Sequence, residues 1–196
     1  TSSDLIVLAG DTLDAKFHAS SDRITILLDL FDYITPMIAS RNKKLRIIYG
    51  TQSHDGYPQL QILNPYMSRM DMKIIPHVTE EVVGNTTILY IPEEIISDKH
   101  EYYKDTLYSG KKYDYIFGHG VILEGMPMVK ESKTKMRSTP KLKVGELRDA
   151  VKYYALFGHY HENWIDKNVG YIGSISLFRH GENKPKGWYL IDGKSL

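Results

Sequence analysis

Apolar positions recur with two different periods along the first 75 residues of the chain. Short apolar runs at residues 4–9, 45–49 and 72–75 predict buried strands. Between the first two runs, apolar residues spaced three and four apart predict a helix over residues 22–40, which Pro36 kinks or ends. A strand–helix–strand order of this kind is typical of a parallel strand pair joined by a crossover helix.

The rest of the chain predicts more strands than helices. A hairpin is expected where residues 81–83 and 87–90 flank a turn at Gly84-Asn85. Further strands are expected at residues 114–117, 153–157, 169–172, 175–178 and 187–191, the last three being antiparallel with glycine-containing turns. Further helices are expected at residues 58–67, 92–108 and 144–153, the second of them with Pro92 in its first turn. Residues 124–143 show no clear periodicity and are expected to form a long loop. The whole pattern predicts an α/β domain.

Composition excludes several classes of protein. A chain of 196 residues is long enough for one domain with a buried core. Its formal net charge of +1 excludes a basic field over the whole molecule, so any surface for nucleic acid is local. The lack of cysteine excludes disulfides and thiolate zinc sites, and it agrees with a reducing cytosol. No apolar run approaches the roughly 20 residues of a membrane helix, so no membrane partner is expected.

Four of the predicted strands end in a glycine that is followed closely by a metal-capable side chain. The four stretches are Gly10-Asp11, Gly50 with His54-Asp55, Gly118-His119, and Gly158-His159-Tyr160-His161. Because ligands of α/β sheets bind outside the carboxyl ends of the strands, these side chains are expected at one edge. Carboxylate and imidazole donors without sulfur favour Mn²⁺, Fe or Zn²⁺, and a carboxylate such as Asp11 can bridge two ions. Two such ions suit phosphoester hydrolysis, since they clamp the phosphate and generate hydroxide near neutral pH.

The order and spacing of these motifs resemble those of the calcineurin-like metallophosphoesterases. The matching stretches are Gly10-Asp11-x-x-Asp14, Gly50…His54-Asp55, Gly118-His119 and Gly158-His159-x-His161. Within that superfamily the chain looks most like the nuclease subunit of SbcCD-type DNA-repair complexes. The resemblance runs over nearly the whole chain. It implies an α/β sandwich of two mixed β-sheets packed face to face, with helices outside and metals at the strand ends of one edge.

The resemblance also implies a role for each motif residue. Asp11 would bridge two divalent ions, His119 and His159 would bind one of them, and His161 would bind the other. His54 would assist departure of the leaving group or contact the phosphate. The two remaining acids of these motifs, Asp14 and Asp55, would orient ligands and loops, Asp55 as the neighbour of His54 in the catalytic loop.

The sequence departs from the family pattern in two places. The family's Gly-Asn-His-Asp stands here as Gly50-Thr51-Gln52-Ser53-His54-Asp55, so the Asn ligand is replaced. Either Ser53 takes its place, through an oxygen or a water, or His54 itself ligates. The family's first motif, Asp-x-His on the first strand, has no counterpart before residue 4. We expect a single metallophosphoesterase domain over residues 1–196 whose first strand lies upstream of Thr1; the alternative is a degenerate member of the family.

The function that the resemblance implies is metal-dependent phosphodiester hydrolysis of DNA, as an exonuclease or endonuclease with Mn²⁺. It also implies a coiled-coil ATPase partner, a homodimer and a cytoplasmic location in a bacterium or in the host of its phage. One alternative keeps the chemistry but changes the substrate, giving a stand-alone phosphatase or nucleotide phosphodiesterase. Another is a catalytically inactive scaffold with the same fold. Upstream sequence with an Asp-x-His after an apolar strand would argue against the scaffold.

A basic segment lies between the Gly118-His119 and Gly158-His159 strands. Its cations include Lys130, Lys133, Lys135 and Arg137. Lysine and arginine neutralise phosphates and so supply affinity for DNA, which makes these four residues candidate DNA contacts. A solvated surface loop explains the same composition equally well.

Overall fold

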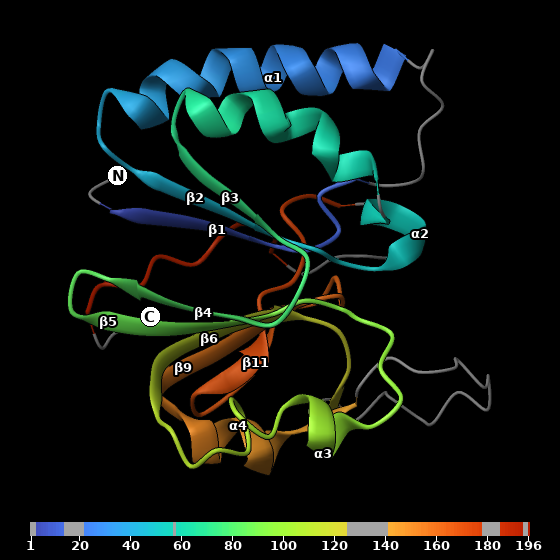
Figure 1. Ribbon diagram of the computed structural model, residues 1–196, viewed down its shortest axis with the longest axis vertical. Coiled ribbons are helices and arrows are strands. Elements are labelled where there is room, and N and C mark those ends of the chain that lie inside the picture. Colours follow the sequence, from blue (N-terminus) through green and yellow to red (C-terminus); the bar gives the residue numbers. More distant parts are fainter. Residues whose placement is uncertain (1–2, 14–21, 57, 125–140, 178–184, 194–195) are drawn as a thin grey trace.

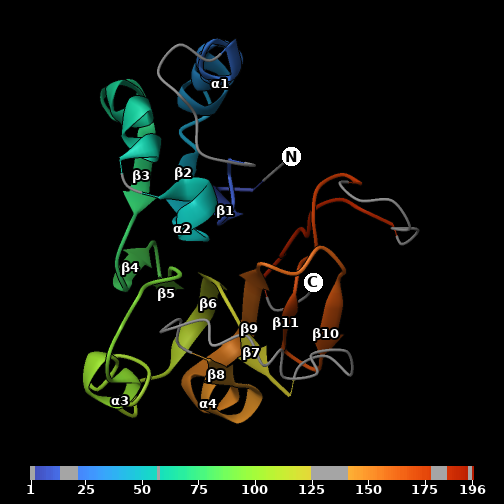
Figure 2. The same ribbon diagram turned by 90° about the vertical axis from the view of Figure 1, so that its right-hand side faces the viewer.

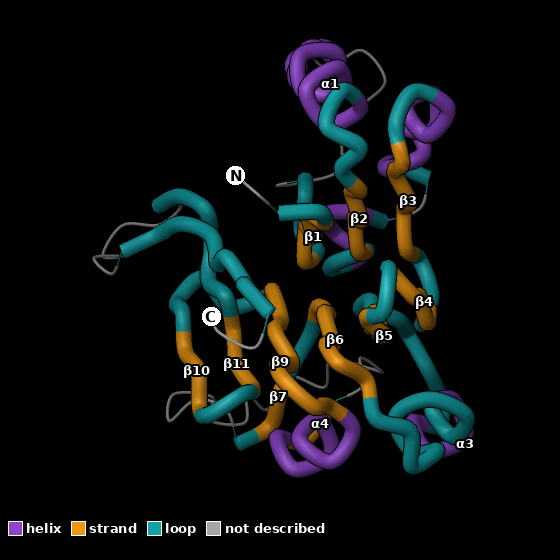
Figure 3. Tube along the Cα trace, turned by 90° about the vertical axis from the view of Figure 1, so that its left-hand side faces the viewer, coloured by secondary structure: helices purple, strands orange, loops and turns teal. Residues whose placement is uncertain are grey.

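Two β-sheets pack face to face, and helices cover both outer sides (Figures 1 and 3). The structure is a computed structural model that describes residues 3–13, 22–56, 58–124, 141–177, 185–193 and 196. The layers run from helices through a three-stranded sheet and a six-stranded sheet to a second set of helices. The expected α/β class with helices flanking the sheets is confirmed.

The smaller sheet is parallel throughout its described strands, in the order β1-β2-β3. Its strands are β1 (Leu5–Ala9), β2 (Lys44–Ile48) and β3 (Asp71–Ile75). Helix α1 (Asp22–Ala39) and the 3₁₀ helix η1 (Gln59–Ser68) connect these strands and cover the outer face. Their apolar sides meet the sheet in a core that includes Phe31, Leu45 and Leu63. In the described part of the chain β1 pairs with β2 alone, so β1 lies at the edge of its sheet.

The larger sheet is mixed, in the order β10-β11-β9-β6-β5-β4 (Figure 2). Its strands are β4 (Thr79–Val83), β5 (Thr86–Ile91), β6 (Tyr113–His119), β9 (Val151–Gly158), β10 (Trp164–Asp166) and β11 (Val169–Tyr171). The four central strands are parallel, and β4 and β10 pair antiparallel at the two edges. The expectation of two mixed sheets is therefore correct for this sheet only.

Two short helices and a two-stranded ribbon cover the outer face of the larger sheet. These elements are α3 (Lys99–Tyr102), α4 (Val144–Ala150), β7 (Ile122–Leu123) and β8 (Leu142–Lys143). Leu147 of α4 and Tyr103, which follows α3, are fully buried in the core beneath them. None of the helices in the described ranges combines the length and the apolarity that a bilayer crossing requires.

The prediction of a helix over residues 92–108 is wrong. Strand β5 continues to Ile91, residues 92–98 form no helix, and α3 covers only Lys99–Tyr102. The backbone N–H of Glu93 donates to the carbonyl of Tyr49, and Glu94 accepts from the backbone of Val78 and the hydroxyl of Tyr102. These long-range hydrogen bonds hold the segment extended and override its local preference for a helix start.

The two last predicted strands are also absent from the described residues. Residues 175–177 and 187–191 form no strand, whereas β10, which was not predicted, pairs with β11. Side chains hold this part of the chain instead of a strand ladder. Lys186 donates to the carbonyl of His161 at 2.5 Å, and Asn163 donates to the hydroxyl of Tyr189 at 3.3 Å.

A buried ion pair crosses the interface between the two sheets. Arg46 of β2 is 1% exposed and donates two hydrogen bonds of 2.8 Å to the carboxylate of Glu81 of β4. Lys73 and the hydroxyl of Tyr90 donate to the same carboxylate. Burial raises the pKa of Glu81, but these donors outweigh it and lower the pKa from 4.5 to about 2. Glu81 therefore stabilises the fold in its charged form.

Replacing Glu81 with Gln is expected to lower the free energy of unfolding by about 3 kcal/mol at pH 7, because the buried charge of Arg46 loses its two hydrogen bonds to a carboxylate and keeps the more exposed Asp71 as its ion-pair partner. Since the folded pKa lies below the unfolded one, this stabilisation is complete above pH 4.5 and is lost as the pH falls towards 2. Urea denaturation between pH 7 and pH 3 measures both effects. Glu80→Gln on the same strand is the control, because the Glu80–Lys111 pair is exposed and its loss is expected to cost less than about 1 kcal/mol.

Candidate metal centre

Three of the predicted ligands lie together at the carboxyl ends of the strands. Asp11 follows β1, His119 ends β6 and His159 follows β9. Each offers one ligand atom, and these atoms all lie within 4.8 Å of one another. The cluster therefore draws on both sheets, since β1 belongs to the smaller sheet and β6 and β9 to the larger.

His119 is held in one orientation by a contact between the two sheets. Its side chain is 1% exposed, and its Nδ1 lies 2.8 Å from the carbonyl oxygen of Ala9 in β1. Because a carbonyl only accepts, Nδ1 carries the hydrogen, and Nε2 is left facing the carboxylate of Asp11 at 3.3 Å. A metal-binding histidine is commonly fixed in this way, with the second nitrogen bonded to the protein.

Glycines at two motif positions allow this contact. A Cβ on Gly158 would lie 2.0 Å from the carbonyl oxygen of Ala9 and 2.9 Å from Nδ1 of His119. A Cβ on Gly10 would lie 2.2 Å from the same nitrogen, and Gly10 has a φ of +80°. The glycines of the Gly-Asp and Gly-His motifs therefore let the backbones of the two sheets approach each other at the site.

Asp11 is ionised by its surroundings. Burial raises its pKa, but the hydrogen bond and charge of His119, together with a backbone hydrogen bond from Thr51, hold the pKa at about 2. The Thr51 N–H donates to Oδ1 at 2.7 Å. Burial lowers the pKa of His119, and the carboxylate of Asp11 raises it by more. Without a bound cation, the two side chains thus stabilise each other's charge.

The position of His159 fits a metal ligand. Its φ of 106° is in the left-handed region, which costs a residue with a side chain about 1–3 kcal/mol and is typical of functional sites. Its Nδ1 is buried and has no hydrogen-bond partner. It lies 3.3 Å from a carboxylate oxygen of Glu93 but without the geometry of a hydrogen bond. A buried nitrogen of this kind calls for an unseen partner, and a cation satisfies it.

Asp55 connects the loops on which the site is built. It is fully buried and accepts hydrogen bonds from the backbone N–H groups of Gly50, Thr12 and Leu13. Burial raises its pKa, while the backbone donors lower it. Its contacts are those of a residue that orients loops.

Two further predicted residues lie on α2 (Gln52–Asp55), which follows Gly50. His54 is half-buried, and its Nδ1 lies 3.2 Å from the carbonyl of Leu13. Its charge lowers the pKa of Asp11, so it lies close to the cluster. Ser53 is exposed on α2. The other predicted contact residues, Asp14, Lys130, Lys133, Lys135 and Arg137, lie outside the described residues.

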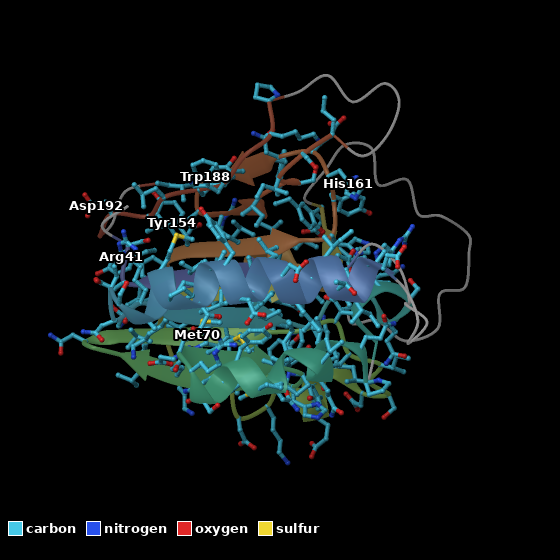
Figure 4. All side chains as sticks on the ribbon, turned by 90° about the horizontal axis from the view of Figure 1, so that it is seen from above. Arg41, Met70, Tyr154, His161, Trp188 and Asp192 are labelled. Atoms are coloured by element: carbon cyan, nitrogen blue, oxygen red, sulfur yellow. The ribbon has the colours of Figure 1, made fainter. Side chains whose placement is uncertain are left out.

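His161 is not a member of the three-residue cluster. It follows β9, which ends at Gly158, and its side chain is labelled in Figure 4. Its backbone carbonyl accepts hydrogen bonds from Ser174 and Lys186. Its role as ligand of a second ion stays a prediction.

Glu93, which the motif pattern does not predict as a site residue, lies against the cluster. Its side chain is 4% exposed, and its Oε2 lies 3.3 Å from His159 Nδ1 and 3.6 Å from His119 Nε2. We expected it in the first turn of a helix. A signal was present, since Glu93 lies two residues beyond the apolar run of β5, at the same strand edge as the other ligands. Unlike them, it does not follow a glycine.

Comparison with known proteins adds no relative. No protein-family model matches the sequence, and no curated protein is significantly similar to it.

Replacing Gly158 with Ala is expected to lower the free energy of unfolding by about 1–3 kcal/mol, because the new methyl group separates Ala9 from His119. Thermal denaturation followed by circular dichroism measures the loss. Gly145→Ala is the matched control, since a Cβ on that exposed residue of α4 meets no atom within 4 Å. The Gly145 variant is expected to be as stable as the wild type or slightly more stable. Equal stability of the two variants would contradict the proposed close approach.

Proposed function

We propose that this chain hydrolyses phosphodiester bonds of DNA in a metal-dependent reaction, with Mn²⁺ as the ion. The observation that carries the proposal is the meeting of Asp11, His119 and His159 within 4.8 Å at the carboxyl ends of strands from two sheets. The donors are a carboxylate oxygen and imidazole nitrogens, with no sulfur, and such a set suits Mn²⁺, Fe or Zn²⁺. The buried, unpartnered Nδ1 of His159 supports the same conclusion.

Each side chain has a task that follows from its contacts. Asp11 stays ionised and supplies negative charge to the centre. His119 presents Nε2 because Ala9 holds Nδ1, and His159 supplies a second nitrogen. A divalent ion held by these donors would supply Lewis acidity, which offsets the charge of a phosphate and makes water more acidic. Pairing two ions requires donors beyond these three, and His161 is proposed as one of them.

His54 is proposed to protonate the leaving oxygen. Leu13 holds its Nδ1, which leaves Nε2 for the substrate. The helix α2 that carries it begins directly after Thr51, whose backbone contacts Asp11. General acid catalysis of this type accelerates reactions by about 10²–10⁴-fold.

The choice of DNA as substrate rests on the motif resemblance and on the basic segment with Lys130, Lys133, Lys135 and Arg137. A coiled-coil ATPase partner, a homodimer and a cytoplasmic location belong to the same proposal.

Mn²⁺-dependent cleavage of linear duplex DNA tests the proposal, with a chromogenic phosphodiester as the second substrate. Replacing His159 with Ala is expected to lower DNA cleavage at least about 100-fold, because the centre loses a donor. His77→Ala is the control, since the side chain of His77 is 75% exposed and pairs with Glu94, away from the cluster. Cleavage of the small ester alone would point to a nucleotide phosphodiesterase. Bound metal without cleavage of either substrate would point to a scaffold.

Replacing His54 with Gln is expected to lower kcat for DNA by about 10²–10⁴-fold while the affinity for Mn²⁺ changes little, because His54 acts on the leaving group. Steady-state kinetics and calorimetric titration with Mn²⁺ separate the two effects. If metal affinity falls together with kcat, His54 is a ligand, which is the other role left open for it by the sequence.

A further inference from the structure

We propose that Glu93 is a fourth metal-binding side chain of this centre and supplies the donor that the family's Asn would give. This inference rests on the proposed function, because it assigns a further ligand to the same site. In this assignment a buried carboxylate that follows β5 replaces the Asn ligand, whereas the sequence pattern indicated Ser53 or His54 on α2.

Glu93 approaches both imidazoles of the cluster, although it is not one of the three residues whose ligand atoms all lie within 4.8 Å of one another. Oε2 of Glu93 lies 3.6 Å from His119 Nε2 and 3.3 Å from His159 Nδ1. His119 Nε2 also lies 3.3 Å from Asp11 Oδ1. Ligands bound at about 2.0–2.2 Å from a divalent ion lie roughly 3.0–3.6 Å from their neighbours. The separations from Glu93 to His119 and to His159 therefore agree with a shared ion, and joining all four donors on that ion requires a small movement of side chains.

Burial of the Glu93 carboxylate points to a cation. Its side chain is 4% exposed, and in the described part of the chain its ion-pair partners are the two imidazoles of His119 and His159. The hydroxyl of Thr51 donates to the same oxygen at 3.3 Å. A charged carboxylate removed from water is costly unless it is paired or binds a metal. With no lysine or arginine against it in these ranges, Glu93 lacks the permanent positive charge that Glu81 has in Arg46.

The backbone holds Glu93 at the centre from both sides. The N–H of Glu93 donates to the carbonyl of Tyr49 at 3.1 Å, and Tyr49 directly follows β2 of the smaller sheet. Thr51, two residues later, contacts the carboxylates of both Glu93 and Asp11. Glu93 is thus fixed relative to the loop in which the family carries its Asn ligand.

Two carboxylates and two imidazoles give a donor set whose charge balances one divalent ion. An Asn in this place leaves a net charge of +1 on the ion with its ligands, whereas Glu93 leaves none. The carboxylate therefore strengthens the affinity for a hard cation such as Mn²⁺.

Calorimetric titration of the protein with Mn²⁺ alone tests Glu93. Glu93→Gln keeps the shape and removes the charge, so the affinity is expected to fall by about 10–100-fold. Glu94→Gln is the matched control, because Glu94 is the neighbouring residue, is 13% exposed, and contacts His77, Val78 and Tyr102 instead of the cluster. Its affinity for Mn²⁺ is expected to equal that of the wild type.

Thermal denaturation without metal separates a ligand from a structural residue. Glu93→Gln is expected to melt at or above the wild-type temperature, since a buried negative charge is removed, and to gain less stability from Mn²⁺. If Glu93→Gln does not fold, Glu93→Asp is the second variant, since it keeps the charge but moves the carboxylate oxygens away from the cluster. Its affinity for Mn²⁺ is expected to fall about tenfold. Failure of both variants to fold overturns the proposal in favour of a structural role.

The outcomes for Glu93 and for the proposed function differ. Wild-type affinity in Glu93→Gln overturns the assignment of Glu93 and leaves the centre of Asp11, His119 and His159 standing. No binding of Mn²⁺ by the wild-type protein overturns both.

Discussion

The candidate centre depends on the close approach of two sheets at the carboxyl ends of their strands. The hydrogen bond from His119 Nδ1 to the Ala9 carbonyl spans this junction, and it forms because Gly10 and Gly158 place no side chain between the backbones. The orientation of His119 follows from this packing, and the charge of His119 in turn helps to keep Asp11 ionised. The glycine backbones therefore position two of the three side chains of the cluster.

Charge is distributed differently at two places where the sheets meet. Between Arg46 and Glu81 the charges are complementary, and Asp71 and Lys73 complete the network of ion pairs. At the strand ends, Asp11 and Glu93 face two imidazoles, whose charge depends on protonation. The first arrangement pairs permanent charges within the protein, whereas the second leaves a donor set that could hold a metal ion.

The sequence predicted the parts of the structure that depend on local pattern. The strands β1, β2, β3 and β6, the helix α1 and the hairpin of β4 with β5 all have strong periodicity or clear turn residues. The pattern of a glycine directly before an aspartate or histidine predicted Asp11, His119 and His159 as members of one site. The prediction failed for Pro92-Glu93-Glu94, whose composition is that of a helix start, because hydrogen bonds to Tyr49, Val78 and Tyr102 hold it extended. Such bonds join residues far apart in the chain and leave no local signal.

In the described part of the chain, strand β1 lies at the edge of its sheet. It carries Asp11 at one end, pairs with β2 on one side, and has half-buried apolar side chains along its length. An unpaired strand edge is a template onto which another extended chain can add by backbone hydrogen bonds. A strand that adds to this edge, whether from another chain or as the first strand that the motif resemblance implies, would run beside the loop that holds Asp11.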